Sequence, residues 1–508
     1  MLRSRRGVSP PPDCAASPPS ALARPPPPQR PHASPPGPDQ PHAQRSKVYT
    51  LAELERHNTA SSLKVAVRGK VYDLTSFLSR HPGGRIMLLL AAGRDATALF
   101  ESYHPNTAKV EPLLAKYEVG AFQAPPLHQA GDPSAPDSRS DPLLQRLPQY
   151  GRDDIATPFY VDLKRRVHSY IATESRYCQQ WHDGPTQALR LAAIVALIVG
   201  FMYASLSAPS AAAAVAFAAL AGVSRALSGV HVLHDASHGS LGKDPRWWHV
   251  LGVVGNDVIN GTSFYMWQHQ HLLVHHLYCN VPGVDDDMDS EPMLRFHEGQ
   301  QLRWFHRFQA LYAVPLYGAM GLVTRARDVA CFLSGFKGAC RLRPPRAVDR
   351  LAFWGGKAAF LAMQLGVPLA LGFSPARVAL QFVAADWLGG MYLASCFQCS
   401  HVADGVATGK HVGGKWAEEQ VATTQDYGHG SLLTYLMTGG LNYQVVHHLL
   451  PGVSQFHYPS IQPIIAKCCA DHGVPYRCLP GAGDAIMSHL RHLNKMGNPQ
   501  RATAAKAA

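Results

Sequence analysis

The sequence contains 508 residues, of which 46% are apolar and 16% are charged, and its formal net charge is +12 with the histidines neutral. This length exceeds that of one ordinary domain, and the basic residues gather beside apolar stretches without the interleaved aromatic residues of a nucleic-acid-binding stripe. We therefore exclude nucleic acid as a partner and expect two or more domains that meet an anionic membrane face. The ten cysteines have no framework spacing, which favours a reducing compartment.

Residues 1–45 contain most of the proline runs of the chain and show no hydrophobic periodicity. Such a composition buries too little apolar surface to fold, so we expect this segment to be disordered. It opens with the letters MLRSRR but lacks the apolar stretch of a secretory signal. Its Arg-rich, acid-poor start leaves a plastid transit peptide as an open alternative.

Residues 46–122 have the pattern of a small compact α+β domain. The stretch VAVRGKVYDLTSFL alternates as strands do, turns at the letters RGK, and leads to a helix that Thr75 could cap. His81 follows in a His-Pro-Gly-Gly turn, and His104 comes after the apolar run IMLLLAAG. Two histidines across an apolar slot are what a six-coordinate haem requires. A surface turn histidine without a ligand would explain the turn alone, but not the pair.

This pair of histidines, with its spacing and the closing letters KYEVG, resembles cytochrome b5. The resemblance implies a haem b with His81 and His104 as axial ligands. Because both axial positions would be protein nitrogens, such a haem would pass electrons and would not bind oxygen. The electron donor that the resemblance implies is an NADH-cytochrome b5 reductase.

Two polar segments follow the haem domain. Residues 123–157 are rich in Pro, Asp and Ser, so we expect a flexible linker that lets the haem domain swing. The segment FYVDLKRRVHSYIATESRY is amphipathic and is expected to lie along the membrane surface. Its residues Lys164, Arg165 and Arg166 would then face lipid headgroups.

Four apolar stretches form two hairpins, whose loops SAPSA and GFSPAR are nearly free of charge. Each stretch is long enough for a ~30 Å hydrocarbon core. The expected spans are residues 188–206, 211–233, 351–373 and 378–397. Basic residues crowd the side opposite the loops, which the positive-inside rule places in the cytosol. Arg225, inside the second span, should face protein or a substrate channel, and the shorter apolar run 310–323 should be re-entrant or interfacial.

Histidines gather in three clusters beside these spans. The clusters contain His234 and His238, then His271, His275 and His276, then His447 and His448. In a helix, His271 and His275 lie on one face and His276 lies ~100° round the same turn, which would offer three imidazoles to one point. Neutral imidazole suits iron, copper, zinc or nickel. The clustered histidines exceed what one metal binds, so we infer two metal ions in a histidine-rich cage.

The letters HDASH, HLLVHH and QVVHH resemble the three histidine boxes of membrane fatty acyl desaturases, and the glutamine that opens the third box resembles the front-end subgroup. This resemblance covers about residues 45–480. It implies two irons, O2 as co-substrate, and a further histidine ligand just beyond the fourth span. The implied metal ligands are His234, His238, His271, His275, His276, His401, His447 and His448. Gln444 joins them in the catalytic set, as a weak ligand or as a residue that orients a neighbour or a water.

Other polar residues near the boxes are interpreted more plainly. His231 and His269 have no partner motif, so we expect packing or support of the ligands. The acidic run at Asp285, Asp286, Asp287 and Asp289 is interpreted as a solvated loop. Its alternatives are a supplement to the metal site or a contact with a cationic headgroup or coenzyme.

Removal of hydrogen from an unactivated methylene is beyond any side-chain acid or base, so this chemistry needs metal-activated oxygen. The resemblance implies front-end desaturation of a polyunsaturated acyl chain, with a cis double bond inserted toward the carboxyl end and delta-5 favoured. Departures from the family pattern at the letters LYC and DDDMD leave delta-4, delta-6 and delta-8 specificity open. Also open are acyl-lipid or acyl-CoA attachment and a sphingolipid long-chain base. A hydroxylase and a non-catalytic membrane haem carrier are the rival classes.

The predicted fold is mostly α. It joins the small α+β cytochrome b5-like domain to a four-span membrane desaturase domain over 158–490, with the histidine boxes in a cytosolic cap. Residues 491–508 are expected to be a disordered tail. The resemblance implies a multi-pass protein of the endoplasmic reticulum membrane with both catalytic and haem domains cytosolic.

Overall fold

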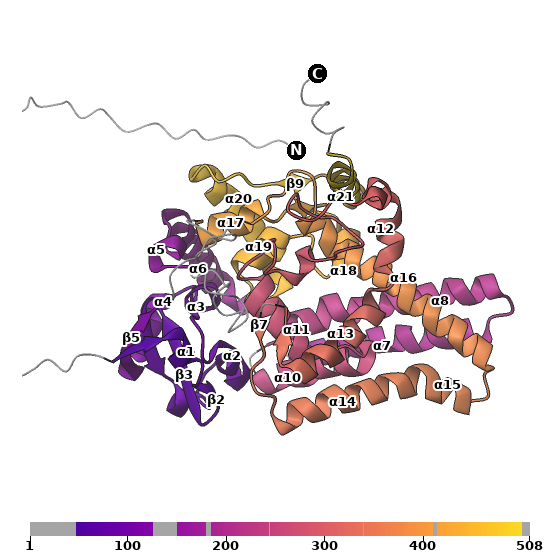
Figure 1. Ribbon diagram of the computed structural model, residues 1–508, viewed down its shortest axis with the longest axis horizontal. Helices are drawn as coiled ribbons and strands as arrows, with labels where there is room; N and C mark the ends of the chain where they lie inside the picture. The colour runs from indigo at the N-terminus through magenta and orange to yellow at the C-terminus, as the bar shows by residue number, and fades with distance from the viewer. Residues whose placement is uncertain are drawn as a thin grey trace, which may run out of the picture. The chain divides into compact units, whose positions relative to one another are not determined.

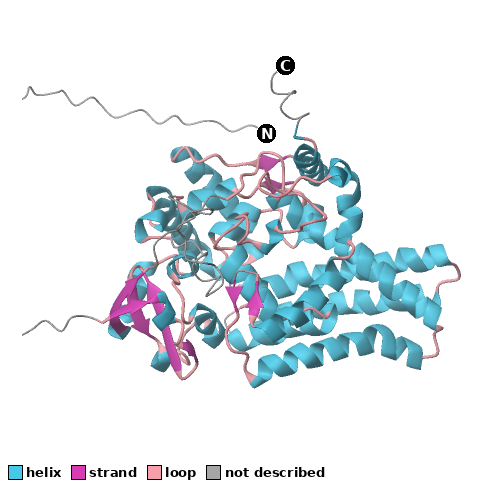
Figure 2. Ribbon diagram, in the orientation of Figure 1, coloured by secondary structure: helices cyan, strands magenta, loops and turns pink. Residues whose placement is uncertain are grey.

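The computed structural model describes residues 47–124, 150–178, 184–242, 244–338, 340–409 and 414–499. Figure 1 shows a small unit of strands and short helices at the start of this part and a larger helical remainder. Strands are concentrated in the small unit, as Figure 2 shows. The expectation of a mostly α chain with a small α+β domain is therefore confirmed. The expectations for residues 1–45 and for most of the linker lie outside the described residues.

The small unit is built on a five-stranded sheet in the order β1-β5-β4-β3-β2. Its strands are β1 Val48–Thr50, β2 Asn58–Thr59, β3 Ser62–Val67, β4 Lys70–Asp73 and β5 Glu118–Gln123. Arg68 and Gly69 have φ of 52° and 75°, which is the left-handed two-residue turn that a tight hairpin favours. The expected cap is absent, because the Thr75 hydroxyl instead accepts the backbone N–H of Leu63 at 2.9 Å.

Helices of the small unit carry the two predicted haem ligands. These elements are α1 Leu51–Leu54, the 3-10 turn η1 Thr75–Phe77, α2 Gly84–Ala91, α3 Thr97–Tyr103, α4 Thr107–Leu114 and the 3-10 turn η2 Ala115–Tyr117. His81 lies just before α2, and His104 is the C-cap residue of α3. The two histidines therefore sit at helix ends that face each other.

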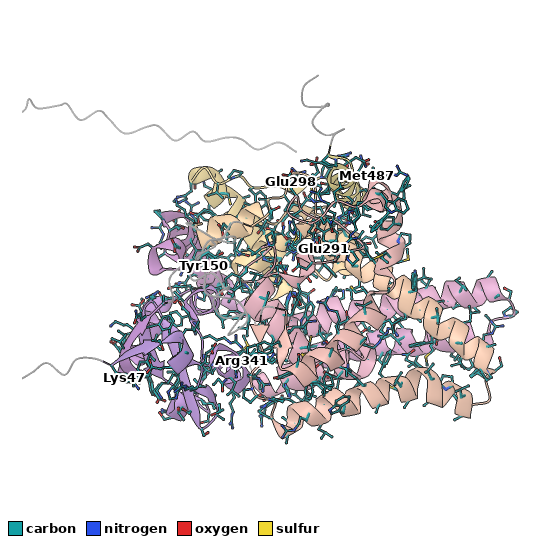
Figure 3. All side chains as sticks on the ribbon, in the orientation of Figure 1. Lys47, Tyr150, Glu291, Glu298, Arg341 and Met487 are labelled. Atoms are coloured by element: carbon teal, nitrogen blue, oxygen red, sulfur yellow. The ribbon has the colours of Figure 1, made fainter. Side chains whose placement is uncertain are left out.

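The polar segment after the haem domain is packed against protein. It forms α5 Arg152–Ile155 and α6 Pro158–Cys178. Tyr150, labelled in Figure 3, is buried and stacks on Tyr278 with ring centroids 6.0 Å apart, so the end of the expected linker is fixed. The expectation that Lys164 faces lipid is wrong, because its ammonium is buried against the carboxylate of Glu101 at 2.6 Å.

Two helical stretches of the described residues are long and apolar enough to cross a membrane, Gln187–Ser207 and Ala211–Ser237. The first belongs to α7 Gly184–Ser207, and the second comprises α8 Ala211–Ser228, the π-helix η3 Gly229–Leu233 and α9 His234–Ser237. The third expected span comprises α14 Ala347–Leu361, the π-helix η8 Ala362–Gly366 and α15 Val367–Ala370. The fourth lies within α16 Pro375–His401. Gln381 and Asp386 reduce the hydropathy of α16.

α8 and α16 cross in close contact. A Cβ on Gly222 would lie 2.1 Å from the backbone oxygen of Ala385, so only glycine allows this approach. Beside the crossing, the Arg225 guanidinium donates to Asp386 at 2.6 Å, and Arg325 pairs with the other oxygen of that carboxylate. Arg225 therefore faces protein, which was one of the two environments expected for it.

The remaining elements form a cap over one end of these helices. They are α10 Pro245–Val253, η4 Val254–Asn260, α11 Phe264–Gln270, η5 His271–His275, η6 Asp286–Met288, η7 Trp304–Phe308, α12 Gln309–Tyr317, α13 Met320–Ser334, β6 Phe336–Lys337, β7 Cys340–Arg341, α17 Trp416–Ala422, β8 Asp426–Tyr427, α18 Leu432–Thr438, α19 Gln444–Leu449, η9 Gln455–His457, α20 Tyr458–Asp471, β9 Cys478–Leu479 and α21 Ala482–Gly497. α21 covers the start of the expected disordered tail, where Leu493 is fully buried. That part of the tail expectation is wrong.

Candidate functional site

The predicted haem ligands face each other across a gap of the right size. The ring centroids of His81 and His104 are 6.3 Å apart. An imidazole nitrogen lies roughly 2 Å from a bound transition metal, so two rings on opposite faces of one iron would have centroids about 6 Å apart. The Nδ1 of His81 lies 3.2 Å from the Gly84 oxygen, and the Nδ1 of His104 lies 2.8 Å from the Phe100 oxygen. Each Nδ1–H is thereby used, which leaves both Nε2 lone pairs for a metal.

The two glycines that follow the His81-Pro82 pair are each required for a different structural reason. A Cβ on Gly83 would lie 2.8 Å from the His81 ring, so its absence leaves room for the imidazole. Gly84 has φ of +80°, and a Cβ there would meet Pro245 at 2.7 Å. Burial lowers the pKa of both histidines, which keeps the imidazoles neutral and able to bind a metal. The residues present suit a haem.

The histidines of the three sequence clusters converge with His401 in one buried cage. They come from α9 and its C-cap, from η5 and the residue after it, from the end of α16, and from α19. All eight side chains are 5% exposed or less. Burial of eight imidazoles in one place has no structural advantage, so the cage points to a ligand.

The cage divides into two groups of donor atoms that each lie within 4.8 Å of one another. The first group is His234, His238, His271 and His447, and the second group is His275, Cys279, His401 and His448. His276 lies between them, with its ring centroid 4.4 Å from that of His447 and 4.5 Å from that of His448. The expectation that one turn offers three imidazoles to one point is wrong, because His271 and His275 belong to different groups.

A π-helical turn explains this division. The backbone N–H of His276 donates to the oxygen of His271 at 3.0 Å, which is an i to i+5 hydrogen bond. The extra residue in the turn keeps the His271 and His275 rings nearly parallel at 5.5 Å while placing His276 at 83° to His271. Single-turn π-bulges of this kind recur at functional sites.

Side chains other than the eight histidines hold five of the imidazoles through Nδ1. The partner atoms and distances are Tyr103 Oη to His238, 2.8 Å; Asp285 Oδ2 to His275, 3.0 Å; Cys279 Sγ to His401, 3.4 Å; Tyr458 Oη to His447, 3.0 Å; and Gln420 Oε1 to His448, 2.9 Å. An Nδ1–H that donates outward fixes the tautomer whose Nε2 carries a lone pair inward.

The inward nitrogens face one another without a positive partner. The Nε2 atoms of His234 and His447 are 3.0 Å apart, and those of His271 and His276 are 3.3 Å apart. The Nε2 atoms of His238 and His448 are buried and have no hydrogen-bond partner. Burial lowers the pKa of His238, His271, His276, His447 and His448 well below the ordinary value, so protons do not neutralise these lone pairs. Metal cations would satisfy them, and the cage therefore suits the inferred metal pair.

The acidic run is not the solvated loop that the sequence suggested. Asp285 is fully buried, and burial would lower the pKa of His275, but the charge of Asp285 and its hydrogen bond raise that pKa to about 9. Of the neighbouring carboxylates, Asp289 is exposed, and Asp287 lies 3.4 Å from the Nδ1 of His275. Asp285 therefore supplements the cage, which was one of the alternatives.

Gln444 lies inside the cage beside His401. Its amide nitrogen donates to the Nε2 of His401 at 2.9 Å, and its Oε1 is buried without a partner. His231 and His269 lie outside both groups. The Nε2 of His231 contacts the Leu436 oxygen at 2.7 Å, and the Nε2 of His269 accepts the backbone N–H of Arg343 at 3.1 Å, so both have structural partners.

Sequence reasoning missed four side chains that hold the cage, namely Tyr103, Cys279, Gln420 and Tyr458. Only Cys279 offered a local signal, because it follows His275 by four residues, the spacing of side chains on one helical face. The other three come from segments far from the imidazoles they hold, and no spacing rule connects them.

Comparisons with known proteins agree with both sites. The family model for fatty acid desaturases matches residues 209–480, and the model described as "Cytochrome b5-like Heme/Steroid binding domain" matches residues 50–123. The chain is 35% identical to "Delta(5) fatty acid desaturase A" of Dictyostelium discoideum, with 89% of this chain and 94% of that protein covered. It is 37% identical to "Acyl-lipid (8-3)-desaturase" of Mortierella alpina, with 89% and 98% covered. It is 29% identical to "sn-1 linoleoyl-lipid 6-desaturase" of Arthrospira platensis, with 67% and 94% covered.

Proposed function

Because the chain belongs to the fatty acid desaturase family and carries a fused cytochrome b5-like domain, it is a front-end acyl-lipid desaturase, and we propose that it acts at the delta-5 position. The proposal of delta-5 rests on the relative named for that position, which is similar to this chain over nearly its whole length. The relative named as a 6-desaturase covers less of this chain and is less similar. Delta-6 is for this reason the second candidate.

The single observation that carries the catalytic assignment is the convergence of buried Nε2 lone pairs. We assign one iron to His234, His238, His271 and His447, and one to His275, His401 and His448, with His276 between the two groups. When bound, the two irons supply the activation of O2 that removal of two methylene hydrogens requires. The chain's own contribution is to fix five of these imidazoles by their Nδ1 partners.

Gln444 is assigned to orient His401. Its amide nitrogen contacts the same Nε2 that would bind iron, so the amide must turn when metal enters. The unpartnered Oε1 is then free to accept a hydrogen bond from a water in the cage. An amide oxygen is a weaker iron ligand than imidazole, which makes a supporting role the better assignment.

Electrons reach the cage through the fused domain, in which we assign His81 and His104 as the axial ligands of haem b. Their half-buried rings, whose pKa is lowered by burial, and the glycine-lined turn support a haem at this site. When bound, a haem held by these two nitrogens would supply single-electron transfer. We propose an NADH-cytochrome b5 reductase as the donor, because the fused carrier resembles the acceptor of that enzyme.

We further propose four membrane spans, made of α7, of α8, of α14 with α15, and of α16. The first two are long and apolar enough by themselves. Exposed apolar residues along the second pair, such as Leu361, Leu371 and Val383, support contact with lipid. We propose that the cage and the haem domain lie on the cytosolic side of the endoplasmic reticulum membrane, because basic residues crowd the side opposite the hairpin loops. The acyl chain would enter the cage from the bilayer.

Expression in yeast tests the activity and its position. Cells are fed defined twenty-carbon and twenty-two-carbon polyenes, and mass spectrometry locates any new double bond. A bond at delta-5 supports the proposal, a bond at delta-4, delta-6 or delta-8 replaces that position, and hydroxy acids alone would mean a hydroxylase. His275→Ala should abolish the product, whereas His297→Ala, a histidine outside both groups, should not. Loss in both variants would contradict the assignment of the cage.

A further inference from the structure

Tyr103 contacts both redox sites of the chain. It is the last residue of α3, directly before the haem ligand His104, and its hydroxyl lies 2.8 Å from the Nδ1 of His238 in the first histidine group. The two rings are nearly parallel, with an interplanar angle of 18°. One residue of the haem domain thus touches the metal cage while its neighbour is assigned to the haem.

The direction of this hydrogen bond follows from the chemistry of His238. Its Nε2 is buried and unpartnered, and an imidazole that binds metal through Nε2 while neutral must carry its proton on Nδ1. The Nδ1–H of His238 therefore donates to the Tyr103 oxygen. If the Tyr103 hydroxyl donated to Nδ1 instead, the neutral imidazole would carry its proton on Nε2, where it would block the metal. Tyr103 thus accepts a hydrogen bond from the tautomer that binds metal.

Tyr103 is held in place from several sides. A Cβ on Gly452, in the turn after α19, would lie 3.1 Å from the Tyr103 ring, so the turn packs closely on that ring. Two residues before Tyr103, the carboxylate of Glu101 is 2% exposed and pairs with Lys164 of α6 at 2.6 Å. A buried ion pair of this kind needs a fixed geometry, because a misplaced charge would stay unpaired in the interior.

The haem domain and the cage also share one apolar core. The cluster of buried side chains that contains Leu90 and Leu99 of the haem domain continues to Leu272 of η5 and Val446 of α19. On the other side of the haem domain, the side chain of Arg341 lies 3.6 Å from that of Glu55. The contact of Tyr103 with His238 is thus part of a packed interface.

We infer that Tyr103 is the positioning residue that couples the haem domain to the metal pair, by holding His238 toward its iron and by joining it to His104 through one peptide unit and one hydrogen bond. This inference rests on the proposed function. When haem and iron are bound, each event would move one electron from the reduced haem to an oxidised iron of the pair. No bond would form or break, and the Tyr103 hydroxyl would keep its proton.

The test uses the full-length protein, purified in detergent with haem and iron, and compares Tyr103→Phe with the wild type. Tyr72→Phe is the matched control, because it removes a hydroxyl from β4 of the same domain. The haem is reduced by NADH and a soluble cytochrome b5 reductase, then mixed with oxygen and acyl substrate. Stopped-flow absorbance gives the rates of haem reduction and re-oxidation, and elemental analysis gives iron per haem.

In Tyr103→Phe we expect the haem to be reduced at the wild-type rate. The rate of haem re-oxidation or the affinity for iron should be lower by on the order of tenfold. Tyr72→Phe should match the wild type in all three measurements. Unchanged re-oxidation and unchanged iron affinity in Tyr103→Phe would overturn the inference and leave Tyr103 as a packing residue. If the wild type itself shows no substrate-dependent re-oxidation, the proposed function fails instead, and the two failures are distinct.

Discussion

Replacement of Asp285 by asparagine should selectively weaken the second histidine group. The carboxylate of Asp285 is fully buried and accepts three N–H groups. These donors are the Nδ1 of His275 at 3.0 Å, the backbone N of Asn280 at 2.9 Å and the backbone N of Asp287 at 3.2 Å. The first two use Oδ2 and the third uses Oδ1. An asparagine has one oxygen, so its NH2 group must face an N–H at one end of the site.

The size of the effect follows from that mismatch. One buried donor left without an acceptor costs about 1–3 kcal/mol. If the cost falls on the orientation of His275, iron at the second group should bind roughly 5-fold to 150-fold more weakly, since about 1.4 kcal/mol corresponds to tenfold. Loss of the carboxylate charge acts in the same direction, because the anion makes the His275 imidazole a stronger donor to the metal.

The measurement is iron per haem in protein purified from cells, with the haem as an internal standard. We expect a decrease in Asp285→Asn and a wild-type ratio in Asp289→Asn, which alters an exposed carboxylate of the same acidic run. Equal ratios in the two variants would refute the reasoning. A parallel loss of haem and iron in Asp285→Asn would instead mean that the chain is misfolded, and absorbance of the haem reports this directly.

Three further predictions concern folding and docking. Lys164→Met should leave the buried Glu101 short of one cation and destabilise the protein by about 3 kcal/mol. Arg165→Met, at a side chain that is 78% exposed, should change stability little. Thermal unfolding in detergent compares the two variants, and equal shifts of the unfolding temperature would contradict the buried pair. Gly84→Ala should reduce haem retention or haem-domain docking, because alanine is strained at φ of +80° and its Cβ would meet Pro245 at 2.7 Å. Haem absorbance relative to total protein gives the fraction of the variant that retains haem. Wild-type haem retention together with wild-type unfolding would exclude this strain. Burial lowers the pKa of His429, but its ion pair with Asp426 at 3.3 Å raises that pKa to about 9, above the ordinary 6.5. The stability that this pair contributes is therefore fully present below pH 6.5 and is lost as the pH rises through about 9. The unfolding temperature of the wild type should fall more over this window than that of His429→Gln, and parallel curves would disprove the prediction.

Much of the site was predictable from local patterns. Histidine pairs at helical spacing predicted which side chains face inward, and the seven box histidines lie in the cage together with His401. The His-Pro-Gly-Gly turn predicted a fixed imidazole, and the structure adds the reason for each glycine. Hydropathy predicted the first hairpin, because a long apolar run has few other stable environments.

Other features failed because they depend on contacts between distant segments. The amphipathic α6 was expected at the membrane surface, yet Lys164 is used against Glu101 of the haem domain, a partner that periodicity cannot reveal. The acidic run looked like a solvated loop because four carboxylates in five residues usually repel burial. Only the presence of His275 beside Asp285 makes burial of that carboxylate favourable.

The sequence by itself determined the donor types and the two cofactor sites, because ligand chemistry and helical spacing are local properties of the chain. The tertiary structure decided which imidazoles lie close enough to share a metal, which side chains hold five of them through Nδ1, and that Tyr103 links the haem domain to His238. The physical reason is that a π-turn shifts the phase of a helix by one residue, and that hydrogen bonds to Nδ1 come from whichever segment packs alongside. Neither is encoded in the spacing of histidines.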